Sequence, residues 1–431
     1  MKKTVVIAGP MFTRSGYGNH AYSLALSLIK SDLYDVKLYP LPWGTTPNIN
    51  LNPNDPEHAL MLSKVLREAP FKPDIWIQIS IPNEFQPNGH FNIGITAGIE
   101  TTLTKPEWIE GLNRMDLIIA TSEFTKNVFK AQKFEKRNKQ TNAVESILTF
   151  TKPIEVLFEG INYELYKNNS VCDSIKEKLN DLPDFCFLAV GHWLQGGLGH
   201  DRKDIGMLVK TFLDTFKRRG KRKQPALVLK TSLAGFSVLE QEIIKDRLDQ
   251  ICELVKSEGW VGKLPAIYLI NGDLTEEEMK SLYMHPKIKA MVSFTHGEGF
   301  GRPLLEFSAT GKPILAPNWS GQLDFLDPKH CFLMPGELVN VDASSVNEWI
   351  VTGSQWFRVN YEYATKLMQY CHDEYDKILT ITSPHRKITL NNFTEEKMSA
   401  KFLEIIEKYI NIKNEPKQLT IKLPKLTKVT E

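Results

Sequence analysis

The chain has 431 residues, of which 42% are hydrophobic and 24% are charged, and its formal net charge is +2. This length predicts two or three domains with large apolar cores, and the near-neutral balance argues against binding nucleic acid mainly through excess positive charge. The five cysteines are scattered without CxxC spacing, which argues against a disulfide framework or a zinc site.

No stretch of the sequence has the pattern of an export or membrane segment. The apolar run at residues 4–8 is too short for a signal peptide, and no run approaches the ~18 apolar residues of a membrane helix. Together with the scattered cysteines, this predicts a cytoplasmic protein without a transmembrane segment.

The first half of the chain alternates short apolar runs with helical patterns, which is typical of a parallel α/β fold. We expect strands at 4–8, 35–41, 74–81, 91–96 and 115–121, and helices at 21–29, 59–68 and 106–113, with a further helix capped by Ser122. The lysine-rich stretch 130–139 predicts a solvated helix face.

Two features of this half lie where α/β folds place ligands. Gly16 and Gly18 form a glycine turn between the first strand and the first helix, without the GxGxxG spacing of a dinucleotide site. Glu100 follows the strand at 91–96 directly, so it is either a pocket residue or a surface loop glutamate. Trp108 lies in the helix that comes next.

The second half repeats the alternation. We expect strands at 185–190, 226–230, 266–270, 290–294 and 313–317, and helices at 205–216, 240–257, 276–283, 304–310, 344–375 and 395–410, followed by a loose basic tail at 411–431. Thr275 and Glu278 have the spacing of a capping box. The densest basic run is 217–223.

Three cations of this half are candidates for holding phosphate. Arg202 and Lys203 stand at the entry to a helix, where positive charge opposes the helix dipole, and a bound pyrophosphate would compensate them. Lys230 ends a strand and points either into the ligand crevice or, along its aliphatic stem, to the surface.

Residues 296–322 predict a strand, a glycine turn, a short helix and a second strand. Glu298 and Glu306 bracket the turn at Gly299 and Gly301. The backbone N–H groups of such a turn suit phosphate, and the two carboxylates suit the paired hydroxyls of a ribose or a sugar ring. The alternative is a glycine turn with two solvated glutamates.

The run from Glu298 through Phe300 to Glu306 resembles the paired-glutamate motif of retaining GT-B glycosyltransferases of family four. The stretches 311–314 and 319–322 are similar as well, and 116–125 and 153–166 extend the resemblance into the first half. It implies two Rossmann-like doubly wound domains with a cleft between them. The expected divisions are an acceptor domain at 1–170 and a donor domain at 171–393. Residues 394–431 would form a helix that returns to the first domain, followed by the tail.

The resemblance also implies roles for individual residues. Glu306 would hold the nucleotide ribose, Glu298 the donor sugar hydroxyls, and Lys203 the pyrophosphate. Further donor-binding residues are expected in three turns: Gly16 and Gly18, the loop at Gly299, Phe300 and Gly301, and the turn at Asp273. The family usually has an arginine where this chain has His192, so Arg202 is expected to substitute for it.

The sequence therefore predicts a retaining glycosyltransferase that moves a sugar from a UDP- or GDP-sugar to a hydroxyl acceptor. Glu298, Arg202, Lys203 and Lys230 would serve catalysis, and Glu100 and Trp108 the acceptor. No metal and no other cofactor is expected, because the cations would hold the leaving group. The favoured acceptor is a glycan or small molecule; the alternatives are hydroxymethylated DNA bases, or a protein that binds sugar nucleotides without catalysis.

Overall fold

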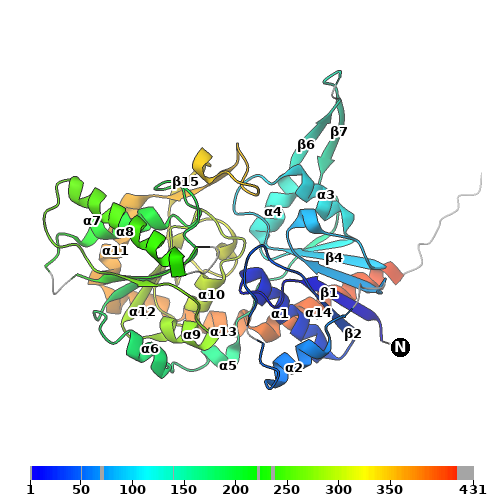
Figure 1. Ribbon diagram of the computed structural model, residues 1–431, viewed down its shortest axis with the longest axis horizontal. Coiled ribbons are helices and arrows are strands. Elements are labelled where there is room, and N and C mark those ends of the chain that lie inside the picture. Colours follow the sequence, from blue (N-terminus) through cyan, green and yellow to red (C-terminus); the bar gives the residue numbers. More distant parts are fainter. Residues whose placement is uncertain are drawn as a thin grey trace, which may run out of the picture.

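The computed structural model describes residues 2–49, 51–67, 72–138, 140–220, 224–233 and 238–414. Within them the chain forms two lobes, each built on a six-stranded parallel sheet (Figure 1). Parts of four expected features lie outside the described residues. These are residue 68 of the second helix, residue 139 of the lysine-rich stretch, residues 221–223 of the densest basic run, and the tail from 415 onward.

The first lobe has the strand order β2-β1-β3-β4-β5-β8. Its inner strands are buried almost throughout, as parallel strands covered on both faces are, whereas the edge strands are partly exposed. The bounds are β1 (Thr4–Gly9), β2 (Asp35–Pro40), β3 (Ile75–Ile79), β4 (Phe91–Thr96), β5 (Leu117–Ala120) and β8 (Ile154–Val156). The helices are α1 (Gly16–Ser31), α2 (Pro56–Ser63), α3 (Pro106–Arg114) and α4 (Glu123–Ala131). Apolar residues of α1 pack on one face of the sheet, and those of α3 and α4 pack on the other.

The second lobe has the order β11-β10-β9-β12-β13-β14. The bounds are β9 (Cys186–Val190), β10 (Ala226–Lys230), β11 (Ile267–Ile270), β12 (Ile288–Val292), β13 (Ile314–Pro317) and β14 (Phe332–Met334). Helices α7 (Ile205–Phe216), α8 (Val238–Ser257) and α11 (Tyr361–Asp373) cover one face, and α6 (Asp173–Lys178), α9 (Glu276–Met284) and α10 (Arg302–Ser308) cover the other. Two short helices, α12 (Tyr375–Thr382) and α13 (His385–Asn392), follow α11, and the one-turn α5 (Tyr163–Tyr166) precedes α6.

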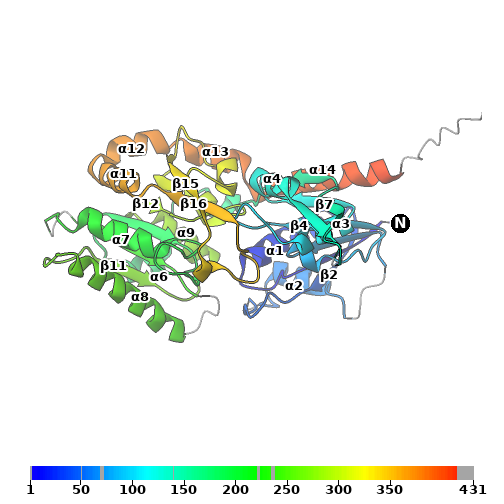
Figure 2. The same cartoon turned by 90° about the horizontal axis from the view of Figure 1, so that it is seen from above.

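The chain crosses between the lobes twice, at neighbouring points. Leu157 belongs to the core of the first lobe and Ile161 to that of the second. The Ile161 N–H donates to Phe393 O at 2.9 Å, and the Glu395 N–H donates to Ile161 O at 2.9 Å, so the two crossing segments lie side by side. The last helix, α14 (Glu395–Asn414), then runs along the first lobe (Figure 2), where it packs against α1.

Two sequence predictions are wrong. The stretch 130–139 is not a helix face: α4 ends at Ala131, and β6 (Lys133–Arg137) pairs with β7 (Val144–Thr149) in a hairpin that projects from the first lobe (Figure 1). Phe134 pairs with Leu148 in that ribbon, and both pack toward the core of the lobe. Phe134 is the only apolar residue of β6, and those of β7 do not alternate, so the sequence shows no strand period here.

The helix expected at 344–375 is also wrong over its first half. Residues 355–359 form β16 (Gln355–Val359), antiparallel to β15 (Gly336–Asn340), and only α11 is helical as expected. Aromatic and β-branched residues in 356–359 fit a half-buried strand. Among the described residues, no helix has the length and apolar character needed to span a membrane.

Candidate active site

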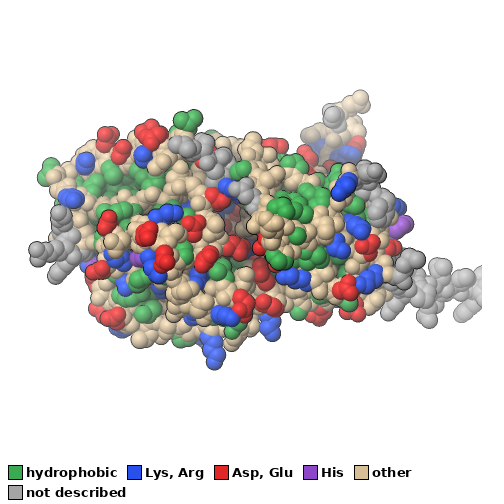
Figure 3. Space-filling model, turned by 60° about the horizontal axis from the view of Figure 1, so that its bottom comes forward, with side chains coloured by type: hydrophobic (Ala, Val, Ile, Leu, Met, Phe, Trp, Pro, Cys, Tyr) green, Lys and Arg blue, Asp and Glu red, His purple; other side chains and the backbone are tan. Residues whose placement is uncertain are grey.

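The loops that follow the carboxyl ends of the strands in the two sheets contact each other between the lobes, as at Ser122 and Gly299. Acidic side chains gather along the recess between the lobes (Figure 3). Among the contacts that cross it are Arg202 Nη1 to Glu100 Oε1 at 2.5 Å, Arg14 Nη1 to Asp273 Oδ2 at 3.0 Å, and the Ser122 hydroxyl to Gly299 O at 2.5 Å. The structure therefore brings Glu100, Arg202, Asp273 and Gly299 together from loops far apart in sequence.

The predicted cations meet at the second-lobe side of the recess. Lys203 pairs with Glu298, and Lys230 donates to Gly272 O at 2.8 Å. Burial lowers the pKa of both lysines, opposed by the carboxylates of Glu298 and Asp273 respectively. These ammonium groups are thus partly desolvated, which strengthens their attraction for an anion.

His192 lies among these cations, at the end of β9. Its Nδ1 is 3.0 Å from the Ser232 hydroxyl. Burial, reinforced by the charges of Arg202, Lys203 and Lys230, lowers the pKa of the imidazole to about 4. A neutral imidazole therefore stands where the resembling family carries an arginine, and the positive charge comes from the loop that follows.

The glycine loop between β12 and α10 is held against the first lobe. Gly301 begins α10 with a φ of 102°, a left-handed conformation that favours glycine. A Cβ on Gly299 would lie 2.4 Å from Ala97 O, so a side chain there would force the lobes apart. Phe300, in contrast, turns into the core and packs on Phe325 with ring centroids 5.1 Å apart.

Glu306 is held by two partners that the motif itself did not reveal. Arg302 Nε donates to one carboxylate oxygen at 2.8 Å, and the Tyr283 hydroxyl donates to the other at 3.0 Å. Burial would lower the pKa of the Arg302 guanidinium, but Glu306, Glu276 and Glu159 together raise it. The spacing of Arg302 and Glu306, four residues apart on a helix, is a signal that sequence reasoning could have used.

Glu159 and His20 are buried ionisable residues beside Arg302 that the sequence analysis missed. Glu159 is 7% exposed and its Oε2 has no hydrogen-bond partner among the described residues; His20 is 4% exposed and its Nε2 is likewise unpaired there. Burial raises the pKa of Glu159 to about 7 and, with the charge of Arg302, lowers that of His20 to about 3. Nothing in the local sequence marks either residue, because only the packing of the lobes buries them.

Gly16 and Gly18 lie in the first turn of α1, which Ser15 caps by accepting a hydrogen bond from the Gly18 N–H at 2.9 Å. Between them, Tyr17 stacks on Trp43 with ring centroids 4.2 Å apart. The Ala97 N–H donates to the Tyr17 hydroxyl at 3.0 Å, which ties this turn to the end of β4.

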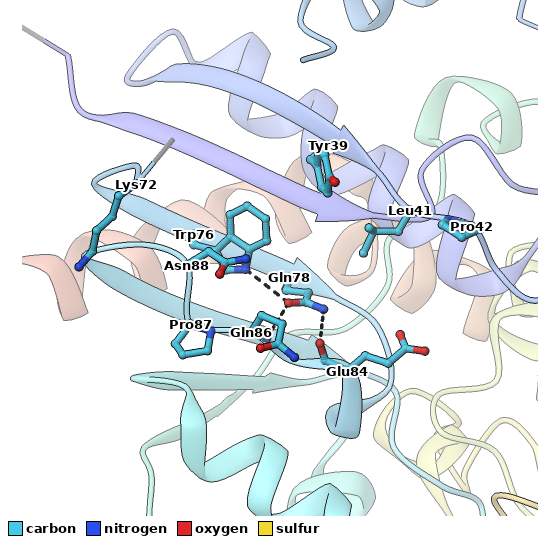
Figure 4. A pocket seen from close by; sticks show the side chains of 10 residues that line it. All are labelled: Tyr39, Leu41, Pro42, Lys72, Trp76, Gln78, Glu84, Gln86, Pro87 and Asn88. Carbon is cyan, nitrogen blue, oxygen red and sulfur yellow. Dashed lines mark hydrogen bonds between the residues drawn. The ribbon is translucent and has the colours of Figure 1, made fainter. Parts of the chain in front are cut away.

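Trp108 does not join the group in the recess. It is 3% exposed and packs on Trp349 with ring centroids 6.3 Å apart, beside a hollow of about 400 Å³ between α3 and residues 348–349. A second hollow, of about 810 Å³, lies on the first lobe, where Tyr39 and Trp76 stand beside polar side chains such as Gln78 and Glu84 (Figure 4). None of the predicted site residues lines that second hollow.

The architecture and the facing carboxyl edges define a GT-B fold, as predicted from the sequence. HepE from Anabaena in complex with UDP-glucose superposes with a TM-score of 0.57 at 13% identity, over 94% of this chain and 100% of that chain. Sucrose-phosphate synthase from Thermosynechococcus elongatus gives 0.60 at 12%, over 95% and 100%. A glycosyltransferase from Rickettsia africae gives 0.59 at 14%, over 96% and 100%. No protein-family model and no curated protein matches the sequence.

Proposed function

We propose that the protein is a retaining glycosyltransferase of family four that transfers a sugar from a nucleotide sugar to a hydroxyl acceptor. One observation carries the proposal: in a GT-B fold, Arg202, Lys203 and Lys230 converge at the second-lobe edge of the recess, in the same group as Glu298. Lysines that are partly desolvated beside a carboxylate suit a ligand with a diphosphate next to sugar hydroxyls.

In this proposal the donor binds mainly to the second lobe. Glu306 accepts hydrogen bonds from the ribose hydroxyls, and Glu298 accepts them from the sugar. The bond from the anomeric carbon to the leaving phosphate oxygen breaks, and the cations stabilise the charge that develops on the diphosphate. The acceptor hydroxyl attacks from the same face, and its proton passes to a leaving phosphate oxygen. Glu100, which reaches across to Arg202, borders the acceptor side.

In the free protein, two of these cations are paired with carboxylates that the proposal assigns to the substrates. Lys203 is paired with Glu298 and Arg202 with Glu100. A diphosphate would take over both cations and release the two carboxylates toward hydroxyl groups. Donor binding would therefore free the very carboxylates that the proposal assigns to the donor sugar and to the acceptor.

A thermal-shift screen against UDP- and GDP-sugars tests the proposal. A ligand at 100 times its Kd stabilises the folded protein by about 2.7 kcal/mol, which raises the melting temperature measurably. The donor that responds is then incubated with candidate acceptors, and NMR of the product gives the anomeric configuration. No response to any nucleotide sugar refutes the proposal, and product with inverted configuration refutes retention.

Slow donor hydrolysis separates an enzyme from a protein that only binds sugar nucleotides, because the latter shows none. The DNA alternative depends on positive charge such as that of the basic stretch 130–139. Within the basic stretch 130–139, Arg137 pairs with Glu135 at 2.5 Å, so part of its positive charge is compensated. If DNA were the acceptor, binding would weaken steeply with salt, and hydroxymethylated duplexes would take label from a radioactive donor.

A further inference from the structure

Glu159 lies in the segment that carries the chain from the first lobe to the second, between Leu157 and Ile161. The following residue, Gly160, sits directly against the start of α14: a Cβ there would lie 2.6 Å from the Glu395 Cα. This packing fixes the backbone next to Glu159. The burial of its side chain is therefore tied to the crossing between the lobes.

Charged groups of the second lobe and a tyrosine of the first interact with this carboxyl group. The charge of Arg302 acts on it most strongly, followed by those of Glu306 and Glu298, and Glu159 in turn acts on Tyr17. The titratable groups that act on it or feel it are thus Tyr17 of α1, Glu298 of the glycine loop, and Arg302 and Glu306 of α10. His20 of α1 and Glu395 of α14 share the charge of Arg302 with it. Glu159 therefore belongs to the same neighbourhood as both glutamates of the proposed donor site.

The carboxyl group lacks a partner in this neighbourhood. Glu159 is 93% buried, yet its Oε2 accepts no hydrogen bond from the described residues. The ion pairs of Arg302 go to Glu306 and Glu276 instead. Buried polar atoms without partners are rare and destabilising, and their presence beside a ligand site points to a group that the ligand supplies.

We propose that Glu159 is a further donor-binding residue, whose unpaired carboxyl oxygen accepts a hydrogen bond from a hydroxyl of the nucleotide sugar beside Glu306. This inference rests on the proposed function. Hydroxyl groups are the donors that a nucleoside diphosphate sugar carries in this region, and a carboxylate is their strongest acceptor. The site then holds three glutamates for hydroxyl recognition, one of them on the segment that joins the lobes.

The proposal has a consequence for protons. A hydrogen bond from a ligand hydroxyl favours the ionised carboxylate and lowers its pKa. In the free protein burial holds the pKa of Glu159 at about 7, so the group is about half protonated at neutral pH. Donor binding should therefore release up to about half a proton near pH 7, and donor affinity should rise with pH until Glu159 is ionised in the free protein.

Titration calorimetry tests this. Wild-type protein is titrated with its nucleotide sugar at about pH 7 in two buffers of different ionisation enthalpy, which gives the number of protons released. Glu159→Gln keeps the shape of the side chain and removes its ionisation. We expect the variant to lose the proton release and, at about pH 8, to bind the donor at least about tenfold more weakly, as for a lost charged hydrogen bond.

Glu84→Gln is the matched control, because the pKa of Glu84 is also raised while the residue lies on the first lobe and lines the hollow of Figure 4. It should release protons and bind donor like the wild type. Equal proton release and equal affinity in wild type and Glu159→Gln would overturn this inference while leaving the proposed function intact. A wild-type protein that binds no nucleotide sugar would overturn both.

Discussion

Replacing Glu159 by glutamine should make the protein more stable at alkaline pH. The folded state must keep an ionised carboxyl group buried there, whereas the unfolded chain solvates it. An ordinary glutamate pKa of 4.5 and a folded-state pKa of about 7 differ by the equivalent of about 3 kcal/mol in unfolding free energy. The pKa of Glu159 is higher in the folded than in the unfolded protein, so its contribution to the unfolding free energy is fully present below pH 4.5. This contribution is lost as the pH rises to about pH 7, and the unfolding free energy then stays level.

The measurement is urea unfolding, followed by tryptophan fluorescence, of wild type and Glu159→Gln between about pH 5 and about pH 9. Over this range the unfolding free energy of the wild type should fall by about 2–3 kcal/mol more than that of the variant. Glu164→Gln, on the exposed side of α5, is the control and should follow the wild type. Identical pH dependence in wild type and Glu159→Gln would show that the carboxyl group is solvated in the folded protein, and the account of its burial would be wrong.

Four further predictions concern the recess. Glu306→Ala should weaken nucleotide binding by about 1.5–3 kcal/mol in calorimetry, the range for a charged hydrogen bond; unchanged binding would remove Glu306 from the ribose site. Lys230→Ala should reduce the affinity for a nucleoside diphosphate far more than for the nucleoside, and equal losses would indicate a folding defect instead. Gly299→Ala should abolish turnover because its Cβ meets Ala97 O, whereas Gly220→Ala, where a Cβ meets nothing within 4 Å, should not; equal activity would show that the lobes need not approach so closely. Saturating donor should alter the small-angle scattering curve as the lobes close, and superimposable curves would count against closure.

Local patterns predicted the elements that are regular and buried. Helix α7 and strands β4 and β10 have the expected bounds, because apolar periodicity and flanking turns agree there with the tertiary packing. The Ser122 cap and the capping box at Thr275 are also present, since each depends on only a few neighbouring residues. The β6–β7 ribbon was missed because β6 has one apolar residue among its charges and so shows no strand period.

The candidate site was predictable only in part, for a related reason. The motifs indicated Glu298, Glu306 and the cations. The structure adds that Lys203 pairs with Glu298 and that Arg202 reaches across the recess to Glu100. Glu159 and His20 could not be found in this way, since their burial arises only when α1, α10 and the crossing segments pack together. A sequence shows which groups can ionise, whereas their environment depends on contacts between distant segments.

The return of α14 makes the first lobe discontinuous along the chain. Its core includes Met398, Phe402 and Ile406, which pack with α1 residues more than three hundred positions earlier. During synthesis from the amino terminus, the second lobe is therefore complete before the first can close its core. A fragment that stops near residue 160 would leave an apolar helix face of α1 open to water, and we expect it to aggregate unless residues 395–414 are supplied as a separate peptide.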